Sequence, residues 1–194
     1  MPVLLPEPNA FPDGLFVPET DVAVDRRWWV LHTRARQEKS LARHLFQARV
    51  PFYLPLIAKR GVARGHIFTS QIPLFPGYVF LLGRREERLV ALTTNRVVHS
   101  LEVADQIKLW YDLSQVWRLI ESGAPITPED HLEPGVFVEI QHGALAGLKG
   151  RIIRAASGRR FVVEVDFIHR GASVMLDDFN LLPIDDPEIA QINR

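Results

Sequence analysis

The sequence contains no cysteine, which excludes disulfide bonds and thiol chemistry and fits a reducing cytosol. It has no apolar run close to the roughly 20 residues that a membrane-spanning helix needs. The N-terminal stretch MPVLLPEPNAFPDG lacks a basic segment and is interrupted by prolines, which excludes a signal peptide. We therefore expect a soluble protein of the cytoplasm.

The chain has no net charge, but its charges are unevenly distributed. Residues 1–25 carry five acidic side chains and no basic ones, residues 26–123 carry sixteen basic and seven acidic, and residues 128–194 carry seven basic and eleven acidic. A basic segment is what binding to a phosphate backbone requires, because each neutralised phosphate releases counterions. A solvated, arginine-rich surface explains the same distribution equally well.

Side chains that carry catalysis or bind metals do not gather at any point of the sequence. The seven histidines occur singly, and no HExxH pattern is present. The acidic pairs Asp177–Asp178 and Asp185–Asp186 lie in polar stretches that are typical of turns. We expect a protein that is not an enzyme and that uses no metal and no cofactor.

The first part of the chain predicts an α+β domain. Residues 1–26, rich in proline, are expected to be a flexible or extended N-terminal extension. Hydrophobic periodicity over 27–122 then predicts strands at 28–33, 52–57, 78–82 and 96–103 and helices at 34–50, 85–94 and 104–122. Residues 58–72, with two glycines and three basic residues, indicate a long hairpin or a flexible excursion. Thr33 is expected to cap the first helix, and Pro55 to interrupt the second strand.

The last part of the chain predicts a different architecture. The stretch 123–134 contains three prolines, and residues 123–132 are expected to be a linker. Residues 133–185 contain five short runs rich in β-branched residues, separated by glycine and polar turns, which favour a small β-barrel. This composition disfavours helix, so we expect a stable barrel that does not refold into a helical hairpin. Residues 186–194 are expected to be a C-terminal tail.

Three segments, in order and correctly spaced, resemble the NusG family of transcription elongation factors across residues 28–185. They are WWVLHTRARQE (28–38), PLFPGYVF (73–80) and LEPGVFVEIQHGALAGLKGRI (132–152). The resemblance implies an N-terminal NusG-like α/β sandwich joined to an SH3-like five-stranded barrel, the KOW domain. It also implies a non-enzymatic factor that suppresses pausing or termination.

The resemblance assigns candidate binding residues. The family's N-terminal domain grips the clamp helices of the largest RNA polymerase subunit, which points here to Trp29, His32, Phe75, Tyr78 and Phe80. Pro73 and Pro76 would hold the chain that enters this strand and lower the entropic cost of presenting aromatic side chains. The family's contact with non-template DNA corresponds to Arg34 and Arg36, and its hairpin near upstream DNA corresponds to Lys59, Arg60 and Arg64. Solvated surface charge is the alternative for each basic residue.

The chain departs from the housekeeping members of the family. TRARQE stands where they have a glycine-tyrosine-glutamate stretch, which is closer to specialised paralogues of the RfaH type. In the barrel, Ile168 and His169 replace the usual Phe and Gly before Arg170, in the segment that meets termination factor Rho and a small-subunit ribosomal protein. The replacement weakens the case for both contacts, and only the ribosomal protein is kept as a candidate partner.

Two other function classes stay open. A KOW-containing module that binds the ribosome or RNA would explain the barrel and the basic charge, but it leaves PLFPGYVF without a role. An enzyme of an unfamiliar kind would need a reactive site, which the sequence does not contain.

Overall fold

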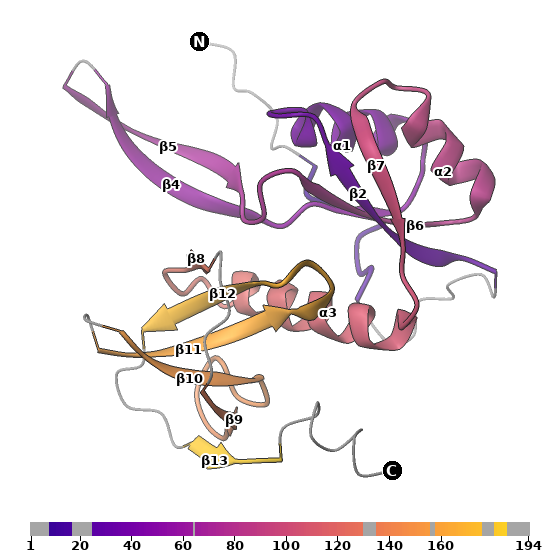
Figure 1. Cartoon of the computed structure of the whole chain (residues 1–194). Helices are drawn as coiled ribbons and strands as arrows, with labels where there is room; N and C mark the ends of the chain where they lie inside the picture. Colours follow the sequence, from indigo (N-terminus) through magenta and orange to yellow (C-terminus); the bar gives the residue numbers. More distant parts are fainter. Residues whose placement is uncertain are drawn as a thin grey trace. The chain divides into compact units, whose positions relative to one another are not determined.

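The fold is described from a computed structural model for residues 8–16, 25–63, 65–129, 135–155, 158–175 and 181–185 (Figure 1). The chain divides into two compact units, Met1–Trp110 and Tyr111–Arg194. The division falls inside helix α3 (Gln106–Glu121), whereas the sequence placed the end of the first domain after residue 122. Within the described ranges, none of the helices has the length and apolar character that crossing a bilayer requires.

The first unit is built on a five-stranded sheet. Every neighbouring pair in it is antiparallel. In spatial order its strands are β1 (Ala10–Phe11), β3 (Phe52–Tyr53), β6 (Tyr78–Gly83), β2 (Arg27–Thr33) and β7 (Val97–Glu102). The strands predicted from the runs WWVLHT and GYVF are therefore confirmed, and they pair with each other at the centre of the sheet.

Helices α1 (Glu38–Gln47) and α2 (Arg85–Leu92) cover one face of this sheet (Figure 1). The hydrophobic core between the helices and the strands consists of Trp29, Leu31, Leu41, Ala42, Leu45, Val50, Phe52, Leu54, Leu56, Val79, Leu81 and Ala91. The prediction that Thr33 caps the first helix is wrong. Thr33 is the last residue of β2 and is buried, and the N-cap position of α1 is Gln37.

The opposite face of the sheet carries a second core, which we call the aromatic layer and define as Phe16, Trp28, Tyr53, Phe75 and Phe80. Phe16 stacks on Trp28 with ring centroids 6.0 Å apart and meets Tyr53 edge-on at 4.9 Å. Phe75 meets Phe80 edge-on at 6.4 Å. Because both faces are covered, the central strands are apolar on both sides.

Part of the expected N-terminal extension belongs to this core. Residues 10–11 form β1, which pairs with β3, and both Leu15 and Phe16 are buried. For residues 8–16 the expectation of a flexible extension is therefore wrong, and the reason is that Phe16 supplies a ring to the aromatic layer. Asp25 and Arg26, at the end of the extension, form ion pairs with Arg84 and Glu87 at 3.0 Å each. Residues 1–7 and 17–24 lie outside the described residues.

The predicted hairpin is confirmed as a separate two-stranded sheet. Strands β4 (Leu56–Ala63) and β5 (His66–Pro73) pair over eight residues each, and they extend beyond the five-stranded sheet as an arm (Figure 1). Pro55 separates β3 from β4, as the sequence indicated, and its carbonyl accepts a hydrogen bond from the Leu74 N–H at 2.8 Å. The base of the arm is thereby closed.

The second unit contains a six-stranded antiparallel sheet. In spatial order its strands are β13 (Leu181–Pro183), β9 (Val136–Ile140), β10 (Lys149–Ala155), β11 (Gly158–Val165), β12 (Arg170–Met175) and β8 (Thr127–Glu129). The five runs predicted as strands correspond to β9 through β13. Strand β8 lies in the segment predicted to be a linker, and it pairs with β12. Among the described residues no pairing closes this sheet, so the expected barrel is not confirmed.

The C-terminal part of α3 belongs to the second unit because polar side chains on one side of the helix bind backbone groups there. Asp112 accepts a hydrogen bond at 3.2 Å from the N–H that begins the 3-10 helix η1 (Asp166–Ile168). Gln115 accepts one at 3.1 Å from the N–H that begins β10, and Arg118 donates one to the carbonyl of Ala146 at 2.7 Å. Residues three apart share a side of a helix, which explains why these three act together.

Candidate functional site

The turn inside PLFPGYVF is held from two directions. The backbone N–H of Gly77 donates a hydrogen bond to Oε1 of Glu38 at 2.7 Å, and its carbonyl accepts one from the Thr33 N–H at 2.8 Å. Gly77 has φ +88°, a conformation that favours glycine. Because Glu38 begins α1 and Thr33 ends β2, the turn that leads into β6 is fixed to both elements.

The fixed turn places Tyr78 in a row of three rings that crosses the sheet. Tyr78 on β6 is the pairing partner of His32 on β2, and their ring centroids lie 5.4 Å apart. His32 is also paired with His99 on β7, and these two rings stack at 6.2 Å with an interplanar angle of 4°. Tyr78 and His32 are half-buried and His99 is exposed. We call these three residues the ring row.

Two of the predicted polymerase-binding residues lie in the aromatic layer, on the same face of the sheet as the ring row. Phe80 follows Tyr78 by two positions along β6 and is fully buried. Phe75 packs edge-on against it and is 1% exposed. These two side chains can support the ring row from the core, but both are buried and neither is part of the protein surface.

Trp29 is separated from the other four predicted residues. It pairs with Leu81 on β6 and belongs to the core beneath α1 and α2, on the opposite face of the sheet. Its indole N–H donates a hydrogen bond to the carbonyl of Gly83 at 3.0 Å, and the guanidinium of Arg88 lies 4.7 Å from the centre of its ring. The five residues therefore do not line one pocket.

Arg34 and Arg36 lie in the turn between β2 and α1, and both are exposed. The helix that the sequence predicted from residue 34 begins only at Glu38. Arg34 follows His32 by two residues, and its N–H donates a hydrogen bond to the carbonyl of Arg96 at 2.8 Å. Arg36 has φ +62°, a conformation that favours glycine over a residue with a long side chain. Among the described residues neither arginine forms an ion pair.

The predicted basic residues of the hairpin lie on the arm. Lys59 and Arg60 are adjacent on β4, so their side chains point to opposite faces, and both are exposed. Arg64 lies outside the described residues.

The three residues predicted to bind a partner in the second unit lie where η1 meets β12. Ile168 ends η1 and is 9% exposed, and Arg170 begins β12. His169 between them is exposed and has φ +50°. That conformation favours glycine, which agrees with the glycine of the family pattern at this position.

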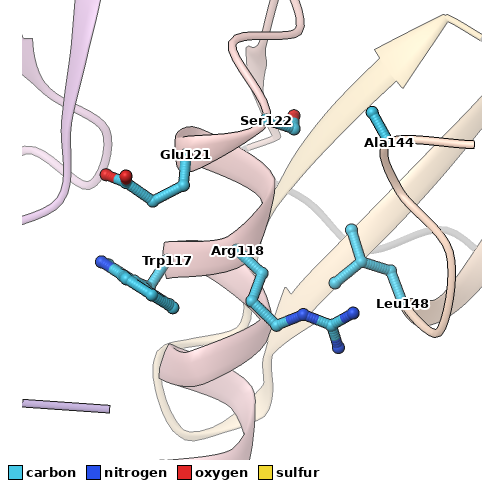
Figure 2. Close-up of a pocket in the computed structure, with 6 residues that line it drawn as sticks. All are labelled: Trp117, Arg118, Glu121, Ser122, Ala144 and Leu148. Atoms are coloured by element: carbon cyan, nitrogen blue, oxygen red, sulfur yellow. The ribbon is translucent and has the colours of Figure 1, made fainter. Parts of the chain in front are cut away.

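The second unit also has a pocket of about 240 Å³ beside the C-terminal end of α3 (Figure 2). Arg118 points from the helix toward the loop that carries Ala144 and Leu148. Its guanidinium is already bound to the carbonyls of Ala146 and Gly147, at 2.7 and 3.3 Å. None of the predicted binding residues lines this pocket. Among the described residues there is also no group of three side chains that could hold a metal ion.

Sequence reasoning missed Glu38 and His99. Glu38 is an acidic residue in the first turn of a helix, where such residues are common, so nothing in the sequence marks its bond to Gly77. His99 lies in a strand that was predicted, but its position beside His32 depends on the pairing of β2 with β7.

Residues 26–126 match the family model NusG, described as "Transcription termination factor nusG". This match spans just over half of the chain and includes the ring row, the turn and the arm. The chain belongs to the NusG family.

Two solved structures are among those that resemble the chain. One, described as "Domain interaction in Thermotoga maritima NusG", is 18% identical with a TM-score of 0.46, and the likeness covers 77% of this chain and 93% of that one. The other, the MjSpt4:Spt5 complex, is 15% identical with a TM-score of 0.27, covering 80% and 98%. Both TM-scores are under 0.5, so we base the assignment on the family match. No curated protein matches the chain at a significant level of sequence similarity.

Proposed function

We propose that this NusG-family chain is a transcription elongation factor that binds RNA polymerase and non-template DNA and suppresses pausing or termination. We further propose that it is a specialised paralogue of the RfaH type that acts in the cytoplasm. The observation that carries the proposal is the ring row. It presents three aromatic rings side by side on β6, β2 and β7, next to the turn that is fixed at Gly77, within the region that matches the family.

The polymerase contact is assigned to Tyr78 and His32, with the clamp helices of the largest subunit as the partner. Aromatic side chains dominate binding energy at protein interfaces, and a fixed backbone reduces the entropy lost on binding. Phe75 and Phe80 support this surface from the aromatic layer. Trp29 contributes from the opposite face by anchoring β2 to β6 through its bond to Gly83.

The nucleic-acid contact is assigned to Arg34 and Arg36 beside the ring row and to Lys59 and Arg60 on the arm, with Arg64 as a further candidate. Arg34 and Arg36 are both exposed in the turn that follows β2, close in sequence to His32, which supports this assignment. Arginine pairs with phosphate and stacks on exposed bases, which suits a displaced single strand.

The second unit is proposed to act as the KOW domain, with residues 133–185 as an SH3-like barrel that binds a small-subunit ribosomal protein. Of the three candidate residues, His169 offers the exposed side chain at the end of η1. Ile168 and Arg170 fix this loop on either side.

The proposal is tested by the affinity of the full-length chain for core RNA polymerase from its own host. We compare wild type with a His32→Ala/Tyr78→Ala double variant and with Leu89→Ala, a matched control on α2 whose side chain is 54% exposed. We expect the double variant to bind at least about thirtyfold more weakly, since a single hot-spot residue contributes about 2 kcal/mol or more. Circular dichroism and thermal unfolding of each variant separate a lost contact from a lost fold.

The ribosome- or RNA-binding module is the alternative function. It predicts that the wild-type chain binds ribosomal subunits or RNA with the same affinity whether or not polymerase is present, and that it does not bind polymerase. Wild-type protein that binds ribosomes and fails to bind polymerase would replace the elongation-factor proposal with this one.

A further inference from the structure

The end of the arm exposes apolar side chains where a soluble hairpin usually carries polar ones. Val62 is 73% exposed, Ile67 is 77% exposed and Phe68 is 48% exposed. Neither the sheet nor the helices of the first unit cover them, because β4 and β5 pair only with each other. Exposed apolar groups gathered in this way mark an interaction surface.

The pairing register arranges these side chains on both faces of the arm. Val62 and Ile67 are opposite each other, so their side chains lie together on one face, next to the pair formed by Arg60 and Thr69. Each apolar group thus lies further out along the arm than a cation on the same face.

The other face repeats this arrangement. Phe68 is opposite Gly61, and its ring occupies the space beside that glycine, where an added Cβ would come within 2.6 Å of the ring. Lys59 and Ser70 form the next pair on this face. The ring is therefore held against the backbone of the arm and still faces solvent.

The charge of the arm indicates the class of partner. Residues 56–73 contain Lys59, Arg60 and Arg64 and no acidic residue. With eight paired positions at about 3.3 Å each, the arm is roughly 26 Å long, which is enough to reach along a neighbouring duplex. Phosphates attract a basic arm, and apolar side chains carried by such an arm can insert between base pairs and unstack them.

We propose that the tip of the arm is a wedge for duplex DNA. Val62 and Ile67 insert at a base step next to a junction between double and single strands, Phe68 covers the opposite side, and Lys59 and Arg60 hold the flanking phosphates. This proposal rests on the proposed function, in which the arm contacts DNA. It adds the role of the apolar residues and the kind of DNA structure that they bind.

The test uses the full-length chain and a synthetic forked DNA duplex with 2-aminopurine in the last base pair before the fork. Fluorescence of 2-aminopurine rises when the base loses its stacking partner. We compare wild type with Val62→Ser/Ile67→Ser, with Lys59→Gln/Arg60→Gln, and with the matched control Leu89→Ser/Val98→Ser, which removes two exposed apolar side chains away from the arm.

Wild type and the control should raise the fluorescence. Val62→Ser/Ile67→Ser should abolish the rise and weaken binding about tenfold, since two apolar side chains are no longer buried. Its slope of log affinity against log salt concentration should stay unchanged, because no charge is altered. Lys59→Gln/Arg60→Gln should reduce that slope by about 2, since each phosphate contact contributes about 0.9.

Three outcomes would overturn the wedge, and they are distinguishable from failure of the proposed function. If Val62→Ser/Ile67→Ser keeps both the rise and the affinity, the arm binds DNA by charge alone and the proposed function stands. If that variant instead loses binding to core RNA polymerase, the tip is a protein contact. If wild type binds no DNA, the wedge fails together with the DNA contact of the proposed function. The affinity of wild type for core RNA polymerase then decides whether the polymerase contact stands.

Discussion

The carboxylate of Glu38, at the start of α1, accepts a hydrogen bond from the backbone N–H of Gly77 at 2.7 Å. Glu38 is 6% exposed, and the two residues are 39 positions apart in the sequence. This bond explains why prolines and a glycine precede the aromatic strand. They form a turn that α1 and β2 hold in place, and the turn delivers Tyr78 to the side of His32.

Replacement of Glu38 tests the role of this bond. Glu38→Ala leaves the Gly77 N–H without its acceptor, and we expect a loss of about 1–3 kcal/mol in the free energy of unfolding, measured by urea denaturation. Glu38→Gln keeps an acceptor oxygen and should restore most of the stability and of the polymerase affinity. Equal losses in both variants would show that the charge of Glu38 matters and that the bond to Gly77 does not.

Phe16 tests whether the N-terminal segment is part of the folded unit. Phe16→Ala removes a ring that stacks on Trp28 and meets Tyr53, and we expect a loss of about 3 kcal/mol in unfolding free energy. Leu89→Ala, at an exposed helical position, should cost less than about 0.5 kcal/mol. A Phe16→Ala variant as stable as that control would contradict the packing of residues 8–16.

Arg36 should show opposite effects on stability and on binding. Arg36→Gly removes the steric strain of a left-handed backbone, which stabilises the fold, but glycine also adds entropy to the unfolded chain, which destabilises it. The first effect is larger, so we expect the free energy of unfolding to rise by about 0.5–1 kcal/mol. Affinity for single-stranded DNA should fall, with the salt slope reduced by about 0.7.

The matched control for Arg36 is Arg49→Gly. Arg49 is also exposed and has φ +57°, and its guanidinium lies 6.0 Å from the centre of the Phe11 ring. It should gain less stability, because that contact is lost, and its DNA affinity should stay unchanged. Equal losses of DNA affinity in the two variants would mean that Arg36 contributes only general positive charge.

Tyr111 should titrate above the usual range for tyrosine. Burial is the largest cause that raises its pKa from 10.0, and the negative charge of Asp112 raises it further. The folded state therefore keeps the phenolic proton to a higher pH than the unfolded state does. The resulting stability is present below the unfolded pKa and is lost as pH rises through the folded one.

Absorbance at 295 nm, compared between wild type and Tyr111→Phe, isolates the titration of Tyr111 from the other tyrosines. Asp112→Asn should lower the Tyr111 pKa toward its usual value. A midpoint at or below 10 in the folded wild-type protein would contradict the environment of Tyr111 described here.

Hydrophobic period and turn residues were enough to predict most elements of the chain. Pro55 marked the break between β3 and β4, and five short apolar runs marked β9 through β13. Strands β1 and β8 were missed because each is two or three residues long and lies in a proline-rich stretch. Such short strands form because they can pair with the edge of a neighbouring strand, β3 for β1 and β12 for β8. The residues of that neighbouring strand are far away in the sequence.

The site was predicted in part. The adjacent residues Trp28 and Trp29 are both buried, on opposite faces of β2. The sequence therefore could not indicate which of them lies on the same face of the sheet as Phe80. A strand covered on both faces has no polar alternation to reveal its orientation. The placement of His99 beside His32 likewise follows from strand pairing, which local sequence does not specify.

The lifetime of host RNA polymerase at a defined pause, measured in single-round transcription, tests the central claim most directly. The claim is that this chain acts on elongation through the ring row. We predict that wild type and Leu89→Ala shorten the pause. With the folded His32→Ala/Tyr78→Ala variant, the pause lifetime should equal the lifetime measured without any added factor. An unchanged or longer pause with wild type, or equal shortening by the double variant, would contradict the claim.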